Sequence, residues 1–294
     1  MLFRVEEAGV LTTIQDLGRH GYRHLGFPLS GAADLLAHRY ANHIVGNPGS
    51  DATLEITMGG LTMEVMEPHL IAVTGADLFA TINETALPLW KAVKVERGDE
   101  LRFKGPVKGV RSYLAVSGGL DQEVILGSRS VYERAGIGRA CQAGDFLAAC
   151  RSLKKQDLSI EGRQLASSYL PIYNNEITLR VIPGRHMDRF TAESIKQLPD
   201  QRFMLAGSDR MGAKLHTDSP LNHKAGADIL SEPVMPGTVQ VAADGQPMIL
   251  LADAQTTGGY TSLGTVVEND LWKVAQLQQG GTVFLKLEER WSGK

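Results

Sequence analysis

Short runs of β-branched and other apolar residues, interrupted every few positions by Gly, Pro, Asp or Asn, occupy most of the 294-residue sequence. Such runs are typical of short strands joined by tight turns. Glycine accounts for 32 residues, about 11% against a usual ~7%, which also favours turns over long helices. Helical periodicity is confined to the segments 32–45, 191–198 and 270–278, and Ser30 is the expected N-cap of the first. The sequence therefore predicts a mainly β protein with a few short helices.

Two features indicate how the chain is organised. Asp244-Gly245 lies between two β-rich runs and is the strongest hairpin signal, and Arg97-Gly98-Asp99 marks a second expected hairpin. A polar stretch at 151–175 has the composition of a domain boundary. We therefore predict an N-terminal β domain at 1–150, a linker at 151–175 and a C-terminal β-barrel domain at 176–294.

Composition excludes several classes of function. The net charge of -3 argues against a nucleic-acid-binding protein or one held at a membrane by basic residues. No apolar run reaches the ~18 residues that span a bilayer, and the N-terminus does not resemble a signal peptide, so we expect a cytoplasmic protein. Two cysteines cannot form a disulfide framework. The eight histidines are scattered and no CxxC or HExxH motif occurs, so no metal site is predicted.

The segment 12–34 is the first candidate site. Walker A and nucleophile-elbow motifs are missing from the chain, whereas this segment combines Asp16, Arg19 and Arg23 with four glycines and an expected helix start at Ser30. Guanidinium groups beside exposed backbone N–H groups suit a carboxylate or another oxyanion. The alternative is a glycine-rich strand-to-helix connection in which Asp16 and Arg19 form a structural pair.

The segment 250–264 is the second candidate site. Hydrogen-bonding side chains follow a buried-type run at Asp253, and two glycines allow backbone to approach a ligand closely. The alternative is a bulged turn between strands, in which threonines satisfy local backbone groups. The expected substrate-contacting residues here are Gln255, Thr256, Thr257, Gly258 and Tyr260.

Two further residues have competing interpretations. Arg210, in the stretch 208–212, is expected either to pair with Asp253, to hold an anionic substrate, or to be an exposed turn residue. Glu55 lies inside an apolar strand. It is either a site carboxylate or the solvent-facing position of an alternating strand.

These segments together resemble a known family. The motifs are TTIQDLGRHGYRHLGFPLSGAAD, ANHIVGNP, LEITMGG, RSYLAVSGGLD, SDRMG and DGQPMILLADAQTTGGY, and the similarity runs from about Leu11 to Leu287. The family is called allophanate hydrolase subunit 2, the biotin-dependent carboxyltransferase family, or the C subunit of bacterial 5-oxoprolinase. The resemblance implies two cyclophilin-like β-barrel domains. One departure is Asp209, where the family usually has Asn, and an added negative charge there would oppose tight anion binding.

The resemblance also implies activities and partners. The first expectation is a subunit, inactive alone, of an ATP-dependent 5-oxoprolinase that opens 5-oxoproline (pyroglutamate) to L-glutamate. Its partners would be an allophanate hydrolase subunit 1-like protein (the B subunit of 5-oxoprolinase) and a lactam-utilisation protein (the A subunit), with ATP and Mg used by the complex rather than by this chain alone. One alternative is a carboxyltransferase acting on urea or a similar amide, with biotin not attached to this chain. The other is a regulatory protein that antagonises a histidine-kinase inhibitor.

The expected site draws on both candidate segments. We predict that two glycine-rich patches, one near each end of the chain, fold into a common anion-holding crevice. The expected catalytic residues are Asp16, Arg19, Glu55, Arg210 and Asp253, and Ser30, Asp34 and Ser208 join the 255–260 residues as substrate contacts.

Overall fold

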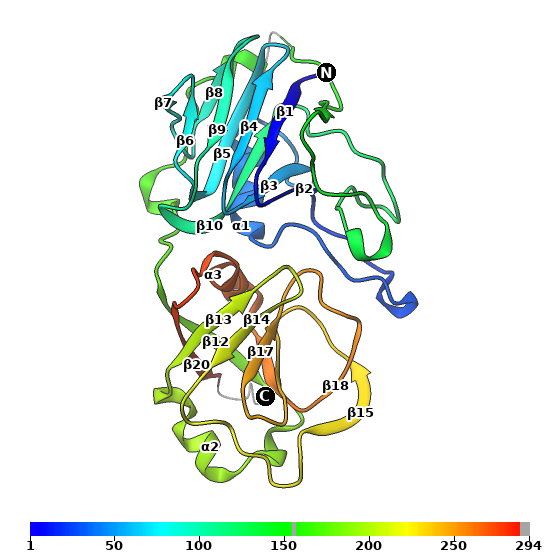
Figure 1. The fold of residues 1–294 in the computed structure, drawn as a ribbon, viewed down its shortest axis with the longest axis vertical. Coiled ribbons are helices and arrows are strands. Elements are labelled where there is room, and N and C mark those ends of the chain that lie inside the picture. Colours follow the sequence, from blue (N-terminus) through cyan, green and yellow to red (C-terminus); the bar gives the residue numbers. More distant parts are fainter. Residues whose placement is uncertain (155–156, 289–294) are drawn as a thin grey trace, which may run out of the picture. The chain divides into compact units, whose positions relative to one another are not determined.

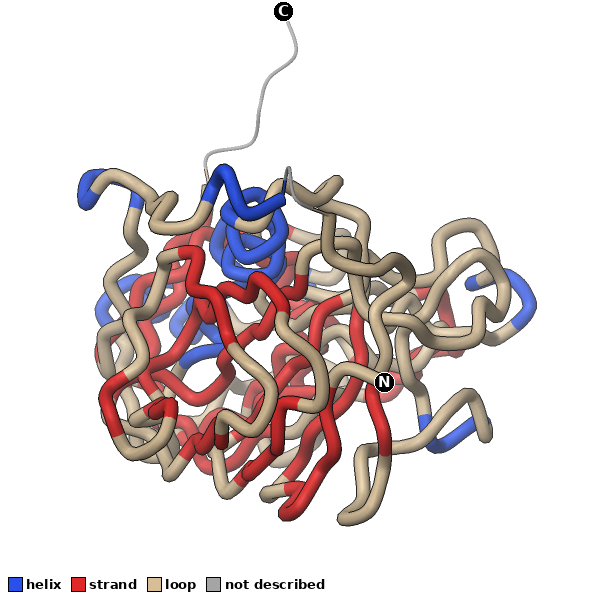
Figure 2. Tube along the Cα trace, turned by 90° about the horizontal axis from the view of Figure 1, so that it is seen from above, coloured by secondary structure: helices blue, strands red, loops and turns tan. Residues whose placement is uncertain are grey.

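The structure, a computed structural model, describes residues 1–154 and 157–288. Lys155 and Gln156 of the predicted linker, and positions 289–294 of the predicted C-terminal domain, lie outside the described residues. The chain divides into two compact units, the first comprising Met1–His20 and Ser30–Tyr173 and the second Gly21–Leu29 and Asn174–Lys294. Strands predominate in both units. Helices are few along the chain (Figure 2), so the predicted mainly β fold is confirmed.

The first unit contains a six-stranded sheet in the order β11-β1-β4-β9-β6-β7 and a five-stranded sheet in the order β2-β3-β10-β5-β8 (Figure 1). Every pairing in them is antiparallel, and side chains of both sheets share one buried apolar cluster. The strands are β1 (Phe3–Ala8), β2 (Leu11–Gln15), β3 (Thr53–Thr57), β4 (Leu61–Val65), β5 (His69–Asp77), β6 (Ala80–Ile82), β7 (Thr85–Ala86), β8 (Ala92–Val95), β9 (Glu100–Phe103), β10 (Lys108–Val116) and β11 (Phe146–Leu147).

Helix α1 (Leu35–Ile44) packs on the five-stranded sheet. Its buried residues Ala37, Ala41 and Ile44 belong to one apolar cluster with Tyr113 of β10. This burial agrees with the i,i+4 apolar spacing in the sequence. The expectation that Ser30 caps the helix is wrong, because α1 begins at Leu35 and the Asp34 carboxylate accepts the Ala37 N–H at 2.9 Å.

The second unit contains a closed barrel in the order β12-β19-β16-β17-β14-β13-β20. Strands β12 and β20 pair in parallel and the other barrel pairs are antiparallel. A separate two-stranded ribbon joins β15 and β18. The strands are β12 (Glu176–Pro183), β13 (Phe203–Ser208), β14 (Gly212–His216), β15 (Asp228–Pro233), β16 (Thr238–Val241), β17 (Pro247–Leu250), β18 (Thr257–Tyr260), β19 (Ser262–Val266) and β20 (Thr282–Leu287).

Short helices complete both units. Helices α2 (Ala192–Gln197) and α3 (Leu271–Gln276) lie within the predicted segments 191–198 and 270–278. The 3-10 turns are η1 (Arg23–Leu25), η2 (Glu133–Ala135), η3 (Asp157–Ile160), η4 (Ser167–Tyr169), η5 (Met187–Arg189), η6 (Leu198–Asp200) and η7 (Glu268–Asp270). Within the described part of the chain, no helix has the length and apolar character needed to cross a membrane.

The two expected hairpins have different outcomes. The Asp244-Gly245 hairpin is confirmed, because β16 and β17 on either side of it pair antiparallel, Val241 opposite Pro247. The hairpin at Arg97-Gly98-Asp99 is wrong. A turn is present, with the Asp99 N–H donating to the Glu96 carbonyl, but β8 before it pairs with β5 while β9 after it pairs with β4 and β6. A turn dipeptide therefore does not by itself decide whether its flanking strands pair.

Candidate functional site

Asp16 follows β2 in the first unit and is 8% exposed. Its carboxylate accepts hydrogen bonds from the Gly18 N–H (2.8 Å), the Ser128 hydroxyl (2.7 Å), the Arg129 N–H (2.6 Å) and the Ser130 hydroxyl (2.6 Å). Burial acts to raise the pKa of Asp16, but these four donors outweigh it, so the pKa lies below its ordinary value. Asp16 is therefore a charged anchor that ties the segment 128–130 to the end of β2.

Arg19 binds the same segment. It is 1% exposed and its Nη2 donates to the Ser130 carbonyl. Backbone packing is also tight here, since a Cβ at Gly31, whose φ is 85°, would lie only 2.9 Å from the Gly18 nitrogen. Asp16 and Arg19 thus both bind Ser130 and share a role in fixing the glycine-rich loop.

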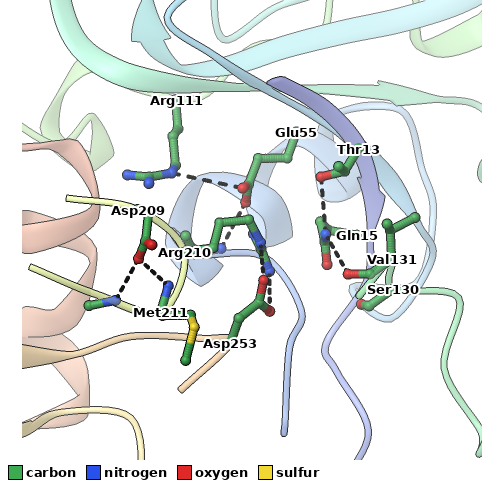
Figure 3. Close-up of polar contacts among 12 residues, drawn as sticks. Thr13, Gln15, Glu55, Arg111, Ser130, Val131, Asp209, Arg210, Met211 and Asp253 are labelled. Atoms are coloured by element: carbon green, nitrogen blue, oxygen red, sulfur yellow. Dashed lines mark hydrogen bonds and ion pairs between the residues drawn. The ribbon is translucent and has the colours of Figure 1, made fainter. Parts of the chain in front are cut away.

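Glu55 lies on β3 and is 1% exposed, so the solvent-facing interpretation of this residue is wrong. Its Oε2 accepts the Tyr113 hydroxyl at 2.8 Å and the Ala33 N–H at 2.9 Å. Its Oε1 lies 3.8 Å from Nε of Arg111 (Figure 3). The Tyr113 hydroxyl also accepts the Asp34 N–H at 2.7 Å. Burial, and then the negative charges of Glu55 and Asp34, raise the pKa of Tyr113 well above its usual value, so Tyr113 remains a neutral donor.

Asp34 and Ser30 stand before α1. Asp34 is fully buried, and its Oδ2 accepts the Tyr173 hydroxyl at 3.1 Å while Oδ1 caps the helix. Ser30 has a left-handed backbone, with φ of 55°, and its hydroxyl is buried without a hydrogen-bond partner among the described residues. In the first unit the carboxylates of Asp16, Glu55 and Asp34 all accept hydroxyl and backbone N–H groups.

Arg210 and Asp253 form a buried ion pair in the second unit (Figure 3). Nε of Arg210 lies 2.8 Å from Oδ2 and Nη2 lies 3.0 Å from Oδ1, and both residues are 7% exposed. The Asp253 N–H also donates to the Arg210 carbonyl at 2.8 Å. Of the interpretations offered by the sequence, pairing with Asp253 is confirmed and an exposed turn arginine is wrong. The arrangement is the bidentate fork for which guanidinium and carboxylate shapes match.

Asp209 shapes the turn that carries Arg210. Its Oδ1 accepts the Met211 N–H at 2.7 Å and the Gly212 N–H at 3.0 Å (Figure 3). An asparagine would make both bonds through its own side-chain oxygen. The departure from the family pattern therefore preserves the turn and changes only the other side-chain atom, from an amide nitrogen to a carboxylate oxygen. Ser208, the last residue of β13, is exposed beside it.

Most of the Gln255–Tyr260 stretch is strand β18, rather than the bulged turn that was one of the two interpretations of this segment. Strand β18 pairs with β15, Gly258 opposite Glu232. Arg23, in the Gly21–Leu29 part of this unit, donates through Nη2 to the Val234 carbonyl and lies 3.4 Å from the Gln255 carbonyl. Nε2 of Gln255 donates to Oε1 of Gln240 at 3.4 Å. The loop after Arg19 and the stretch after Asp253 therefore meet inside the second unit.

The predicted site residues divide between the units. Asp16, Arg19, Ser30, Asp34 and Glu55 belong to the first, whereas Ser208, Arg210, Asp253, Gln255, Thr256, Thr257, Gly258 and Tyr260 belong to the second. The single crevice joining Arg19 with 255–260 stays a prediction. Within residues 1–154 and 157–288, no group of three or more His, Cys, Asp or Glu side chains is arranged to hold a metal ion.

Sequence reasoning missed Tyr113, Ser128 and Gln240. The signals were weak: a single tyrosine and a single glutamine each inside an otherwise β-rich run, and a serine pair around Arg129. A polar side chain within a run that is otherwise buried must find a partner, and this is the rule that would have pointed to Tyr113 and Gln240.

Comparisons with known proteins agree with this architecture. The chain is 36% identical to the 5-oxoprolinase C subunit of Escherichia coli over 95% of its own length and 89% of that protein. It is 33% identical to the 5-oxoprolinase C subunit of Haemophilus influenzae over 92% of its length and 86% of that protein. The solved structure of the K. lactis urea amidolyase matches 97% of the chain with a TM-score of 0.89 and 30% identity, although the chain spans only 18% of that larger protein. The model of the carboxyltransferase domain, subdomain A and B, matches residues 25–287, and the chain belongs to this family.

Proposed function

We propose that this chain is one component of an ATP-dependent complex that opens 5-oxoproline to L-glutamate. The observation that carries the proposal is its similarity to the 5-oxoprolinase C subunit of E. coli, which covers 95% of this chain and 89% of that protein. The two polypeptides therefore match nearly end to end, whereas the urea amidolyases contain this region as a small part of a much longer chain.

The reaction sets clear chemical demands. A lactam carbonyl is a poor electrophile because the nitrogen lone pair delocalises into it. Transfer of the γ-phosphoryl group of ATP to the lactam oxygen would activate it. Water would then attack the ring carbon and the ring C–N bond would break, which frees the amine and leaves an acyl phosphate. A second water would hydrolyse the acyl phosphate to the carboxylate and phosphate. Such steps require cations and oriented donors around the developing negative charge.

The geometry refines the roles proposed for individual residues. Arg210 and the hydroxyls of Thr256 and Thr257 are proposed to stabilise the anion. Asp253 orients the Arg210 guanidinium through its fork, and Asp16 and Arg19 fix the glycine-rich loop by holding Ser130. Of the three carboxylates Asp16, Glu55 and Asp253, we propose that Glu55, which accepts the Tyr113 hydroxyl, transfers protons during the reaction.

The partners and cofactors belong to the same proposal. An allophanate hydrolase subunit 1-like protein and a lactam-utilisation protein would complete the complex in the cytoplasm. ATP with Mg is proposed to bind outside this chain, which has no Walker A sequence.

Reconstitution tests the function directly. The chain is mixed with the two partner homologues, and glutamate release from 5-oxoproline is measured with and without ATP. We expect ATP-dependent glutamate release only when all three proteins are present. Turnover by this chain alone, or none by the full mixture, contradicts the proposal.

Two substitutions test the proposed roles. Arg210→Ala and Asp253→Ala are each expected to lower the activity of the complex by more than tenfold, which corresponds to about 1.4 kcal/mol or more in the barrier. The double variant Arg210→Met/Asp253→Leu is the control, because apolar residues can replace a buried ion pair without loss of stability. A folded double variant with near-normal turnover would make the pair purely structural.

The likeness to urea amidolyase favours one second candidate, carboxyl transfer to urea or another small amide. This activity would depend on a biotinylated carrier from a partner, so addition of avidin would abolish it. Avidin has no effect on the proposed lactam opening, so its effect on the reconstituted mixture supplemented with a biotinylated carrier separates the two candidates.

A further inference from the structure

Two buried N–H donors near the β15–β18 ribbon lack acceptors. Nη1 of Arg23 and Nε2 of Gln240 are both removed from solvent, and neither has a hydrogen-bond partner among residues 1–154 and 157–288. Gln240 is only 4% exposed. Leaving a buried donor unpaired costs about 1–3 kcal/mol, and more when the group is charged. A pair of such donors therefore requires an explanation.

The side chains of Arg23 and Gln240 have Gln255 as a common neighbour. Nη2 of Arg23 bonds to the carbonyls of Val234 and Gln255, and Oε1 of Gln240 accepts from Nε2 of Gln255. A Cβ at Gly258 would clash with Nε2 of Gln240 and would lie 3.2 Å from Cγ1 of Val234. Val234, Gln255 and Gly258 therefore connect the guanidinium to the amide, and glycine at 258 leaves the room that the amide nitrogen occupies.

Charge selects the class of ligand. In the part of the chain that the structure describes, Arg23 forms hydrogen bonds to carbonyls but no ion pair. Burial lowers the pKa of this guanidinium, as expected for a cation without a compensating anion. A neutral amide such as urea would leave the positive charge uncompensated, whereas a carboxylate would neutralise it.

We propose that Nη1 of Arg23 and Nε2 of Gln240 form a binding site for the carboxylate of a small substrate, one oxygen accepting from each. Because this pair of donors carries a single positive charge, it suits a singly charged carboxylate better than a phosphate. This inference rests on the proposed function in one respect: the proposed function identifies the ligand as an amide-bearing acid such as 5-oxoproline. It makes Arg23 and Gln240 determinants of specificity for acids over neutral amides.

The test compares 5-oxoproline with 2-pyrrolidinone, the same lactam ring without a carboxylate. Binding of each to the purified full chain is measured by NMR titration. We expect 5-oxoproline to bind at least tenfold more tightly, and the discrimination to disappear in Gln240→Glu, which replaces a donor by a repelling carboxylate of nearly the same shape. Gln164→Glu, at an exposed position of the first unit, is the matched control for added charge and should retain the discrimination.

Two further arms keep the inference falsifiable. Gln240→Met removes the donor without adding charge, so it tests the site even where Gln240→Glu fails to fold, and Arg23→Lys should weaken 5-oxoproline binding at least threefold. Inorganic phosphate should compete poorly.

Equal binding of the two lactams, undetectable binding of 5-oxoproline, or discrimination that survives Gln240→Met overturns the inference. If the reconstituted complex releases glutamate but its KM for 5-oxoproline is unchanged in Gln240→Met, the inference fails while the proposed function stands. If acids bind as described but no complex opens 5-oxoproline, the proposed function fails alone.

Discussion

Each unit contains an arginine–aspartate pair joined by two hydrogen bonds, Arg139–Asp145 in the first and Arg210–Asp253 in the second, and these two forks differ chiefly in burial. In the first unit, Arg139 meets Asp145 with two contacts of 2.6 Å, and the arginine side chain is 53% exposed. In the second unit, Arg210 meets Asp253 at 2.8 and 3.0 Å, with side chains 7% and 11% exposed. Solvent screens the first pair, whereas removal of either partner from the second leaves a charge without water or counter-ion. Similar contacts therefore carry different energetic weight.

The units also differ in how they satisfy the buried carboxylates that belong to the predicted site. In the first, Asp16 accepts hydrogen bonds from hydroxyl and backbone N–H groups, and Glu55 takes two hydrogen bonds from the same kinds of donor. In the second, Asp253 takes a guanidinium fork. Neutral hydroxyl and N–H donors fix the position of a carboxylate but leave its negative charge in place. A guanidinium also neutralises that charge. Asp16 is thus suited to positioning a loop, and Asp253 to holding a cation in place.

Arg210→Ala is the change that most strongly tests the comparison of the forks. It leaves Asp253 buried without its partner, and we expect a loss of about 3–5 kcal/mol in the free energy of unfolding. Urea unfolding followed by far-UV circular dichroism measures it. Arg210→Met/Asp253→Leu should recover most of the loss. A loss for Arg210→Ala no larger than that for Arg139→Ala would break the distinction between buried and exposed forks.

The first unit also buries a histidine, His38, in its neutral form, in contrast to the buried charges discussed above. It is fully buried on α1, its Nδ1 lies 2.8 Å from the Thr53 hydroxyl, and its Nε2 lies 3.1 Å from the Gly49 carbonyl. Burial lowers the pKa of His38 to about 4, from 6.5 in the unfolded chain. The unfolded state therefore takes up a proton first as the pH falls.

The sign of the effect follows from that order of protonation. The stability that a neutral His38 contributes is fully present above pH 6.5 and is lost as the pH falls from 6.5 towards 4, by up to about 3 kcal/mol. Urea unfolding at a series of pH values measures this slope. His38→Gln should flatten it between pH 6.5 and 4, and an unchanged slope in that variant contradicts the assignment. Below this window Asp270, whose pKa is lowered to about 2 by Arg180 and Lys273 against the effect of burial, adds a separate loss.

Asp16→Asn tests whether neutral donors stabilise a charge in the first unit. Asparagine has one acceptor oxygen in place of two, so its NH2 group would face either the Arg129 N–H or the donors at Oδ1. We expect a loss of about 2 kcal/mol, the cost of leaving a buried polar group unpaired. Ser128→Ala, which removes one donor and leaves the carboxylate with three, should cost less. Equal losses for the two variants would show that the charge of Asp16 contributes nothing.

The fold was predictable where local pattern and tertiary environment agree. Helix α1 followed from apolar residues at i,i+4 spacing, and the β16–β17 hairpin from Asp244-Gly245. Burial of Glu55 was not predictable, because Leu-Glu-Ile in an alternating strand has the pattern of a half-exposed sheet. Strand β3 is instead central, between β2 and β10, and Tyr113 and Ala33 come to Glu55 from distant positions in the sequence.

The site was predictable only in part for the same reason. The pairing of Arg210 with Asp253 was among the alternatives because both residues lie beside turn signals in polar motifs. The placement of Arg23 with the second unit, against Gln255, depends on how the chain returns after its first 20 residues, which no local spacing encodes. Gln240 became a candidate only when its neighbours were known, because a lone glutamine in a strand has no sequence signature of function.

Arg139→Gln, which removes the exposed fork, is expected to change the stability of the protein least. Side-chain hydrogen bonds to Arg139 lower the pKa of Asp145, so the pair is formed at neutral pH. The arginine is nevertheless half exposed, and water replaces its hydrogen bonds when it is removed. The Asp145 carboxylate also keeps the Gln142 N–H at 2.8 Å, so the turn that it stabilises should survive. We therefore expect a urea midpoint indistinguishable from that of the parent chain in 1 M NaCl, where the Debye length is about 3 Å, and at most a slight decrease at low salt. A large, salt-independent decrease would mean that fork geometry, and not burial, decides the contribution of such a pair, and the expectation for Arg210 would then have to be revised as well.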